Sequence, residues 1–229
     1  MLRRLLPILV SLASLFALTA VAMAADAPAM RTIVLVRHGN YVEDPAIPEM
    51  PGPHLSTLGI AQARLAGARL AGEHFDELLV SPMQRARDTA AQIAPDFPGR
   101  AFTVVDDLAE CTPPTWRVEI TKDEKPAAMA ACKARLDRVF ASYFVPAKGH
   151  PEADLLVCHG NVIRYLVTRA LKVDTKAWLE MSIGNASITT IRVESDGRFK
   201  VIAVGDVGHI PPNLRSGATG DADRPLEIP

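Results

Sequence analysis

The stretch that decides the fold is IVLVRHGNY, residues 33–41, in which an apolar run of β-forming residues ends in arginine, histidine and glycine. A second stretch, LLVCHGNVIRY at residues 155–165, is another apolar run that ends in His-Gly-Asn. Short apolar runs of this kind are typical of strands that are buried on both faces. We therefore predict strands at Thr32–Val36 and Asp154–Cys158, each with polar side chains at its carboxyl end.

Between and after these strands, apolar residues recur at helical spacing. Ser81-Pro82 is typical of an N-cap followed by a proline at the first helical position. Asp196-Gly197, between two β-forming runs, predicts a hairpin turn. The other expected elements are helices over Thr57–Glu73, from Ser81-Pro82 to about Ala94, over Ala127–Phe144 and over Val162–Leu171, and strands over Glu77–Val80 and Phe102–Val105.

Strands that alternate with helices predict a three-layer α/β fold, in which helices cover both faces of a mostly parallel central sheet. Residues 111–126 show no periodicity and are expected to form an irregular loop. We expect one domain over residues 25–229, with its core at about 31–210 and an extended tail after residue 211.

Residues 1–24 have the composition of a secretory signal peptide. Arg3 and Arg4 precede an uncharged apolar stretch, and Ala-Met-Ala at 22–24 matches a small-x-small cleavage site. An uncleaved membrane anchor is the alternative, because about 20 apolar residues can span a bilayer. We therefore predict a periplasmic or otherwise exported protein that starts at Ala25, with no stable membrane insertion after cleavage.

The composition gives no support for a nucleic-acid partner. Among the 229 residues, 25 Lys and Arg nearly balance 26 Asp and Glu, and the net charge is −1. The three cysteines allow at most one intramolecular disulfide, and none lies in a zinc-ligand spacing. Cys132 lies on an apolar helical stripe and Cys158 ends an apolar strand, so both are expected to be small core residues.

In a parallel sheet of this kind, ligands bind at the carboxyl ends of the strands. Arg37-His38, Ser81 to Arg85 and His159 all fall at those ends, so three distant segments are expected to meet in one crevice. The planar guanidinium groups of the two arginines match the oxygens of a phosphate. Arg85 lies in the first turn of its helix and Gly160 opens another, and helix N-termini attract anions. These residues predict a pocket for a phosphoryl group.

Histidines in such a pocket predict covalent chemistry. A neutral histidine with one ring nitrogen fixed by a hydrogen bond can take the phosphoryl group on the other, and the phosphohistidine is then hydrolysed. The leaving oxygen needs a proton, for which Glu110 is the candidate, with Asp106 and Asp107 nearby. Arg85 and Arg87 cannot both face the crevice, because side chains two residues apart diverge by about 200° around a helix.

Four stretches together resemble the successive motifs of the histidine phosphatase superfamily, the phosphoglycerate-mutase-like group: VRHGN, LSTLGIAQA, SPMQRARDTA and VCHGNVIRYL. The resemblance covers about residues 31–210 with the motifs in the right order. It implies a phosphoglycerate-mutase-like fold that uses neither a metal nor a cofactor. The roles it implies are His38 as the phosphorylated nucleophile, Glu110 as the proton donor, and Arg37, Arg85 and His159 as the residues that hold the phosphate.

Within the superfamily, ECTPP, AWLEMSIGNASIT and GDVGHIPP are similar to the mitochondrial mutase-like Ser/Thr protein phosphatases. True mutases have a Trp and an Asn soon after the RHG motif, where this chain has Tyr41 and Val42. The expected function is a metal-independent phosphomonoesterase acting on a phosphoprotein or a small phosphoester. The alternatives are a phosphoglycerate mutase-type phosphotransferase and a non-catalytic module that binds phosphorylated groups.

The remaining singled-out residues are expected to have structural roles. Surface positions are predicted for the histidines of loops and turns, His54 and His150, and a helix end for His74. Asn161 is the expected N-cap of its helix. Residues that stay open between a structural role and a place beside the pocket are His209, Asn185 and Ser187, while Trp116 and Trp178 are expected to be core or loop anchors.

Overall fold

The computed structural model describes residues 27–217. Its main sheet has six strands: β2 (Arg31–Arg37), β3 (Glu77–Val80), β4 (Thr103–Val104), β6 (Glu152–Cys158), β7 (Ile188–Val193) and β8 (Phe199–Asp206). The strand order is β4-β3-β6-β2-β7-β8. The first four run parallel, and β7 and β8 add an antiparallel hairpin to β2. The predicted mostly parallel sheet is therefore confirmed.

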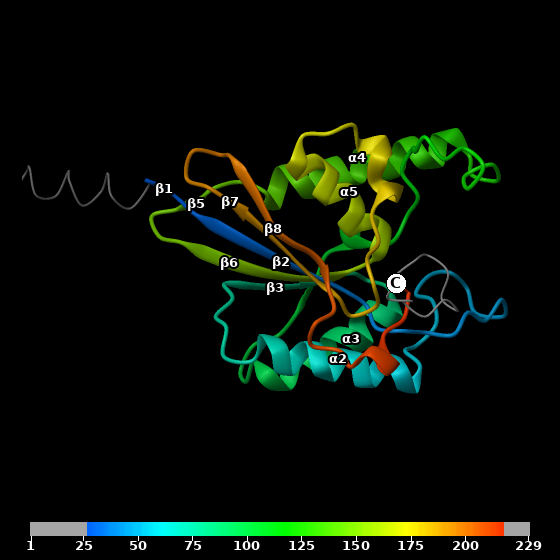
Figure 1. Cartoon of the computed structure of the whole chain (residues 1–229), viewed down its shortest axis with the longest axis horizontal. Helices are drawn as coiled ribbons and strands as arrows, with labels where there is room; N and C mark the ends of the chain where they lie inside the picture. The colour runs from blue at the N-terminus through cyan, green and yellow to red at the C-terminus, as the bar shows by residue number, and fades with distance from the viewer. Residues whose placement is uncertain (1–26, 218–229) are drawn as a thin grey trace, which may run out of the picture.

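Two helices cover each face of the sheet (Figure 1). α2 (Thr57–Leu70) and α3 (Gln84–Ile93) lie on one face, and α4 (Pro126–Tyr143) and α5 (Gly160–Leu171) lie on the other. Each of these helices was expected from the apolar spacing, and their ends differ from the expected ends by a few residues. The three-layer α/β architecture is thus confirmed.

The central strand β2 contributes to two cores, because its side chains point alternately to the two faces. Ile33 and Leu35 pack in the core that includes α4 and α5, whereas Val34 and Val36 pack in the core that includes α2 and α3. None of the four is more than 7% exposed. A strand covered on both faces has no polar side, which is why its sequence is continuously apolar.

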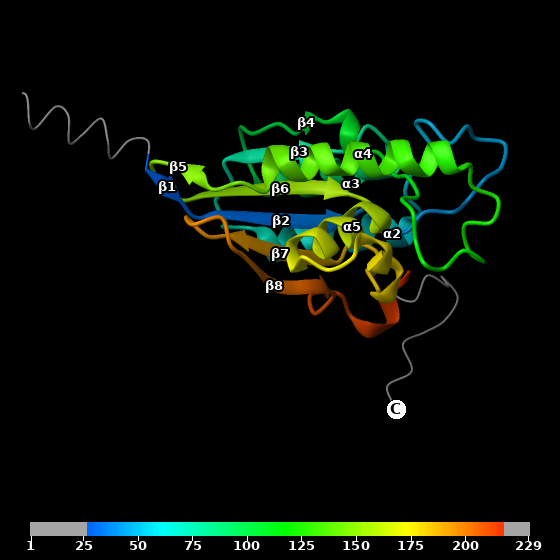
Figure 2. The same cartoon turned by 90° about the horizontal axis from the view of Figure 1, so that it is seen from above.

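The pairing of β2 with β6 positions the two His-Gly motifs. Arg37 lies opposite Cys158 in the parallel register, and the N–H of His38 donates to the carbonyl of Cys158 at 2.9 Å. His38 and His159 therefore leave the sheet from adjacent strands. Figure 2 shows that the loops after β2 and before α4 gather at the end to which the β2 and β6 arrows point.

The hairpin at the sheet edge is confirmed. β7 and β8 pair on either side of Asp196-Gly197, and Gly197 has a φ of 79°, a left-handed conformation that glycine adopts without strain. The residues of β8 alternate between more and less exposed, as expected of an edge strand with one solvated face.

Two predicted helix caps are wrong. Met83, and not Ser81, occupies the N-cap of α3. His159 occupies the N-cap of α5, so Asn161 lies inside that helix. Both side chains make a tertiary contact instead of a cap: the Ser81 hydroxyl is bonded to His159 and accepts only the N–H of Met83 locally, and the Asn161 amide donates to the carbonyl of Cys111.

The cysteines differ in part from expectation. Cys132 is buried in the core, as predicted. It also forms a disulfide with Cys111, with Cα atoms 5.8 Å apart, which is the one intramolecular disulfide that the sequence allowed but did not assign. The helical stripe does bury Cys132, but the loop before α4 brings Cys111 against it. Cys158 is free and buried at the end of β6, as predicted.

Short elements complete the structure. A small separate sheet pairs β1 (Pro28–Ala29) with β5 (Ala147–Lys148), and 3-10 helices lie at η1 (Ala94–Asp96), η2 (Asp106–Leu108), η3 (Thr175–Glu180) and η4 (Pro212–Leu214). Within residues 27–217, no helix has the length and apolar character needed to cross a membrane. The predicted signal at 1–24 and the end of the predicted tail lie outside the described residues, and the predicted domain limits stay a prediction.

Candidate active site

His38 is fixed at its backbone and at one ring nitrogen. Its carbonyl accepts from the N–H of Ala186 at 3.1 Å and from Asn185 Nδ2 at 3.2 Å. Its ring Nδ1 lies 2.8 Å from the carbonyl oxygen of Gly39. Because a carbonyl oxygen can only accept, Nδ1 has the proton of the neutral ring, and Nε2 keeps its lone pair.

The surroundings of His38 keep it neutral. The residue is 2% exposed. Burial lowers the pKa of His38 well below its usual value, and the charges of Arg37 and Arg85 lower it further. Arg85 Nε donates to His38 Nε2 at 3.2 Å, which requires an unprotonated Nε2. His38 thus presents a lone pair beside a guanidinium group.

His159 lies beside His38, with ring centroids 5.1 Å apart. Its Nε2 is 2.6 Å from the hydroxyl of Ser81, which also accepts the N–H of Met83. Ser81 can therefore donate its own proton to Nε2, which leaves the ring proton of His159 on Nδ1. Burial is the main cause that lowers the pKa of His159. Within the described residues Nδ1 is buried without a partner, so it is an available donor for an anion.

α3 directs Arg85 into the crevice. Arg85 is 6% exposed, whereas Arg87 lies on the exposed side of the helix, as helical spacing predicts. The guanidinium of Arg85 stacks over Tyr41, with Cζ 4.8 Å from the ring centroid. Thr89, one turn further along α3, donates to the carbonyl of Arg85 and accepts the N–H of Gly39 at 3.0 Å. This hydroxyl ties the loop after β2 to α3.

Arg37 ends β2 and is anchored through one nitrogen only. Its Nη1 donates to the carbonyl oxygens of Ile183 and Gly217, whereas its Nε is buried without a partner in the described structure. A Cβ atom added to Gly160 would lie 3.4 Å from that Nε, so the glycine keeps the approach open. Burial lowers the pKa of Arg37 to about 10, which leaves it charged at neutral pH.

Glu110 follows η2 and is the carboxyl group of the site. Burial raises the pKa of Glu110 above its usual value, while Arg37 and Arg85 oppose that rise. The backbone N–H of Cys111 donates to Glu110 Oε1 at 3.3 Å. A carboxyl group with a raised pKa next to bound phosphate can supply a proton.

The two alternative acids lie outside the cleft. Asp107 forms an ion pair with Arg138 of α4 at 2.9 Å, and Asp106 is exposed. Neither lines the cleft over Arg85, whereas Glu110 does. The geometry therefore favours Glu110 among the three carboxylates.

Two clefts open near these residues. One, of about 430 Å³, is lined by Arg85, Glu110 and residues of the loop after β2, namely Tyr41, Glu43, Asp44, Pro45, Glu49 and Pro53. The other, of about 700 Å³, is lined by Asn161 and Arg164 of α5 together with residues of the loop before α4 and of the segment 178–182. Of these two clefts, only the first is lined by Glu110.

The other singled-out residues are divided between the surface, the core and the site. The surface positions of His54 and His150 are confirmed. His74 does not close a helix as predicted, because α2 ends at Leu70, and it is exposed beyond that helix. Trp178 is 2% exposed and anchors a loop through Nε1 bonds to Pro113 and Pro114, whereas Trp116 is 54% exposed and is not in the core. Asn185 contacts the site through the His38 backbone, because its amide donates to the His38 carbonyl. Ser187 is buried, and His209 bonds to the Ala186 carbonyl.

Three supporting residues were missed from the sequence. Ser81 holds the ring of His159, and Thr89 holds the N–H of Gly39. Gln62 of α2 accepts the N–H of Asn40 at 2.8 Å and donates to the carbonyl of Leu214, which ties the RHGN loop to the C-terminal segment. For Gln62 and Thr89, the sequence signal that could have revealed these roles was a polar residue on an otherwise apolar helix face.

A comparison with family models decides the family. The model of the histidine phosphatase superfamily (branch 1) matches residues 33–139 and 125–206. The chain belongs to the histidine phosphatase superfamily. Family membership, with the phosphatase names of the relatives below, supports a phosphatase enzyme.

Curated relatives in this superfamily include mitochondrial serine/threonine-protein phosphatases. Pgam5 of Caenorhabditis briggsae is 37% identical over 194 residues, which cover 82% of this chain and 67% of the relative. PGAM5 of Homo sapiens is 35% identical over 199 residues, which cover 82% of this chain and 66% of the relative. The chain thus spans about two thirds of the length of these relatives.

Solved structures show the same fold. A mycobacterial glucosyl-3-phosphoglycerate phosphatase superposes with a TM-score of 0.60 at 23% identity, over 77% of this chain and 99% of that one. The phosphoglycerate mutase of Plasmodium falciparum gives a TM-score of 0.55 at 26% identity, over 80% and 95%. The predicted phosphoglycerate-mutase-like fold is confirmed.

The predicted periplasmic export is wrong by the same comparisons. The relatives are named as mitochondrial proteins, which contradicts the periplasmic location. The prediction rested on composition alone: arginines before an apolar stretch meet a general requirement of targeting segments and do not specify a destination.

Proposed function

We propose that this histidine phosphatase is a metal-independent phosphomonoesterase that works through a phosphohistidine on His38. The observation that most supports this is the state of His38, whose Nδ1 is tied to Gly39 and whose unprotonated Nε2 lies beside Arg85. A histidine nucleophile needs to be neutral, oriented, and next to the charge that binds its target.

In the first step, Nε2 of His38 attacks phosphorus, and the P–N bond forms as the P–O bond to the leaving group breaks. Arg37, Arg85 and the Nδ1–H of His159 bind the outer phosphoryl oxygens and stabilise the charge that they bear in the transition state. Glu110, protonated, gives its proton to the leaving oxygen. Burial raises the pKa of Glu110, which favours the protonated form that this step needs.

In the second step, a water molecule attacks the phosphohistidine. The Glu110 carboxylate takes a proton from this water, the P–N bond breaks, and its electron pair returns to Nε2 of His38. The net reaction converts a phosphate ester and water into an alcohol and inorganic phosphate. Both groups return to their starting states, so no cofactor is consumed.

For the substrate, we propose a phosphorylated serine or threonine of a protein, with a small phosphoester as the second candidate. The relatives at 35–37% identity are named serine/threonine-protein phosphatases, which supports the first. The cleft of about 430 Å³ over Glu110 and the exposed loop that borders it leave room for groups beyond the phosphate.

The alternatives make different predictions. A phosphoglycerate mutase shares this fold, but it would exchange phosphate between the two phosphoglycerates, which a phosphatase hydrolyses or ignores. A binding module would lack turnover altogether, and that usually requires loss of the nucleophile or the acid, whereas His38 and Glu110 are both present. Release of inorganic phosphate from an aryl phosphate distinguishes the enzyme from the module.

Trapping the intermediate tests the proposal. Purified protein is mixed with a radiolabelled phosphoserine peptide and quenched rapidly without acid, because phosphohistidine is acid-labile. We expect label on His38, no label in His38→Ala, and normal labelling in the exposed-histidine control His54→Ala. Label on His159, or an acid-stable phosphoserine in the enzyme, contradicts the assignment.

The proton donor is tested with two leaving groups. Glu110→Gln keeps the shape of the side chain but cannot donate as an acid, so hydrolysis of an alkyl phosphate should fall by at least about 10²-fold. Nitrophenyl phosphate leaves as a much weaker base, and its initial burst should fall far less. Equal losses in the initial burst for both esters would exclude Glu110 as the acid.

A further inference from the structure

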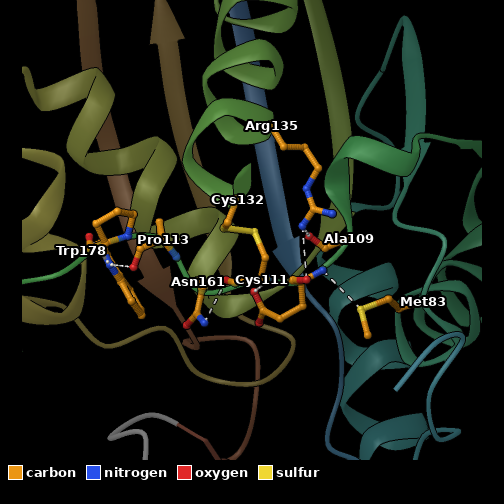
Figure 3. The surroundings of a disulfide bond; sticks show 10 residues. Met83, Ala109, Cys111, Pro113, Cys132, Arg135, Asn161 and Trp178 are labelled. Atoms are coloured by element: carbon orange, nitrogen blue, oxygen red, sulfur yellow. Dashed lines mark hydrogen bonds between the residues drawn. A yellow bond between two sulfur atoms is a disulfide. The ribbon is translucent and has the colours of Figure 1, made fainter. Parts of the chain in front are cut away.

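The segment that bears Glu110 has no regular structure of its own. η2 ends at Leu108, and α4 begins at Pro126. The backbone around Glu110 is therefore not part of a strand or helix. Figure 3 shows side chains of other elements reaching its neighbours Ala109 and Cys111.

α4 supplies two of these side chains. Cys132 forms the disulfide with Cys111, the residue next to Glu110. Arg135, one turn further along α4, donates from Nη2 to the carbonyl oxygen of Ala109 at 2.8 Å and to that of Glu110 at 3.3 Å. Residues three apart lie on one helix face, and Figure 3 shows both side chains reaching from α4 to this segment. The two attachments lie on either side of the Glu110 side chain.

Further along the segment, Trp178 Nε1 donates to the carbonyls of Pro113 and Pro114 at 3.3 and 3.2 Å. The other contacts to the backbone at Glu110 and Cys111 are weaker. The N–H of Glu110 points to the sulfur of Met83 at 3.3 Å, and thioether sulfur is a weak acceptor. Asn161 Nδ2 donates to the carbonyl of Cys111 at 3.3 Å, which is as long as the Arg135 bond to the Glu110 carbonyl and longer than the Arg135 bond to Ala109 at 2.8 Å. Among the attachments described, the disulfide is the one covalent link.

We propose that the Cys111–Cys132 disulfide and Arg135 are positioning groups for the general acid, and that reduction of this disulfide selectively weakens proton donation by Glu110. The proposal rests on the phosphatase mechanism above. It assigns to α4 a role in leaving-group protonation, separate from the groups that bind phosphate.

Reduction is an ordinary thiol–disulfide exchange with a dithiol. A thiolate of the dithiol attacks the sulfur of Cys111, which is only half-buried, and Cys132 leaves as a thiolate that takes up a proton. The second thiol of the reagent then displaces Cys111. The reagent is oxidised to its cyclic disulfide, and the protein gains two thiols.

The effect should be confined to the acid. Without the disulfide, the backbone beside Glu110 is held by Arg135 and the weaker contacts, while Trp178 and Lys176 anchor the chain only further along, at residues 113–115. The carboxyl group then spends less time in reach of the leaving oxygen. His38 is held by β6 and Asn185 and does not depend on this segment. Attack on phosphorus is therefore retained while leaving-group protonation is lost.

The readout is the ratio of alkyl to aryl phosphate hydrolysis, measured as initial rates per folded enzyme. In the oxidised protein treated with dithiothreitol, and in Cys111→Ser/Cys132→Ser without it, the ratio should fall by at least about fivefold, a part of what general acid catalysis is worth. Reoxidation should restore the ratio in the wild type and not in the double variant. Inhibition by inorganic phosphate should stay unchanged, because its binding groups lie outside the segment.

Arg135 has a matched control on the same helix. Arg135→Gln should lower the ratio, and Arg135→Lys should restore part of it. Arg138 lies one helical turn further along α4 and is bonded to Asp107 rather than to the Glu110 segment. Arg138→Gln should therefore not lower the ratio. In a Glu110→Gln background, dithiothreitol should change the ratio no further, because the acid is already absent.

Two outcomes separate this inference from the proposed function. If Glu110→Gln lowers the ratio but neither reduction nor Arg135→Gln does, the positioning role is overturned and the mechanism stands. If Glu110→Gln itself leaves the ratio unchanged, the acid assignment fails, and this inference fails with it. A parallel loss for both esters on reduction also overturns it, since a general structural effect would not distinguish leaving groups.

Discussion

At the scale of single residues, the proposed phosphate site has positive charge that is only partly compensated, which is the basis on which we expect it to bind an anion. In the described structure, the hydrogen-bond partners of Arg37 and Arg85 are carbonyl oxygens and a ring nitrogen. The two guanidinium groups are buried away from water without a paired carboxylate in the described part of the chain, so a bound phosphate would stabilise their charges. The same charges, with burial, keep His38 unprotonated.

Arg85 and Arg87 form a natural pair of variants. Arg85→Ala removes a buried charge-assisted contact to the phosphoryl group, and we expect kcat/KM to fall by about 10²–10³-fold. Arg87→Ala removes an exposed side chain and should change it by less than about twofold. Steady-state kinetics on one aryl phosphate measures both. Equal effects would show that α3 presents a different face to the site.

The two buried histidines should make the protein less stable in mild acid. Burial lowers the pKa of His38 and His159, so below about pH 6.5 the unfolded chain binds more protons than the native one. The free energy of unfolding should therefore fall as pH falls below 6.5, by at most about 1.4 kcal/mol per histidine per pH unit. Glu110, whose pKa is raised, acts with the opposite sign nearer its own pKa.

Urea unfolding at a series of pH values measures this dependence. His159→Asn removes one titrating group, and its slope between about pH 5 and pH 6.5 should be smaller than that of the wild type. An unchanged slope in both His159→Asn and His38→Asn would mean that these histidines are not buried in the neutral form.

At the scale of elements, each functional side chain comes from a junction between elements. His38 and His159 follow β2 and β6, and Arg85 lies in the first turn of α3. Regular hydrogen bonding fixes these positions. Glu110 is the exception, because it lies in a long connection and is held by side chains of α4.

The disulfide should therefore also stabilise the fold. It joins residues 21 apart in sequence. A disulfide that closes a loop of this size typically raises the free energy of unfolding by about 2–4 kcal/mol. Guanidinium unfolding of the oxidised protein and of Cys111→Ser/Cys132→Ser measures the difference. Cys158→Ala, which leaves the disulfide intact, is the control for loss of a thiol, and reductant should destabilise it as much as the wild type. No difference between oxidised and reduced protein would contradict the expectation.

At the scale of the whole molecule, one sheet separates two cores and brings three chain segments to one end. In the proposed mechanism, the charge needed for phosphoryl transfer comes from arginines and helix N-termini at that end. Within residues 27–217, no three His, Cys, Asp or Glu side chains are grouped so that they could hold a metal.

Activity should accordingly persist in a chelator. After exhaustive dialysis against EDTA, we expect phosphatase activity within about twofold of the untreated protein, because arginine supplies the charge stabilisation that metal ions supply in other phosphatases. Loss of activity that Mg²⁺ or Zn²⁺ restores would contradict a metal-independent mechanism. The folded state is checked in parallel by circular dichroism.

The sequence by itself determined the layers of the fold and the set of residues at the strand ends. Burial on both faces requires continuous apolar runs, amphipathic helices require apolar spacing, and a parallel sheet places the ends of its strands at one edge. These are local patterns with one structural solution, so β2, β6 and the hairpin around Asp196-Gly197 could be predicted. The grouping of His38, Arg37, Arg85 and His159 followed from that topology.

Only the tertiary structure decided which atoms meet. Ser81 has the sequence of a helix cap, yet its hydroxyl bonds to His159, 78 residues away. Cys132 has the pattern of a core residue, yet the loop before α4 brings Cys111 to its sulfur. The partner of a hydrogen-bonding group or a thiol is the group that lies within bonding distance. Distances between segments remote in sequence are set by packing. That is why the caps and the disulfide required the structure, whereas the sheet did not.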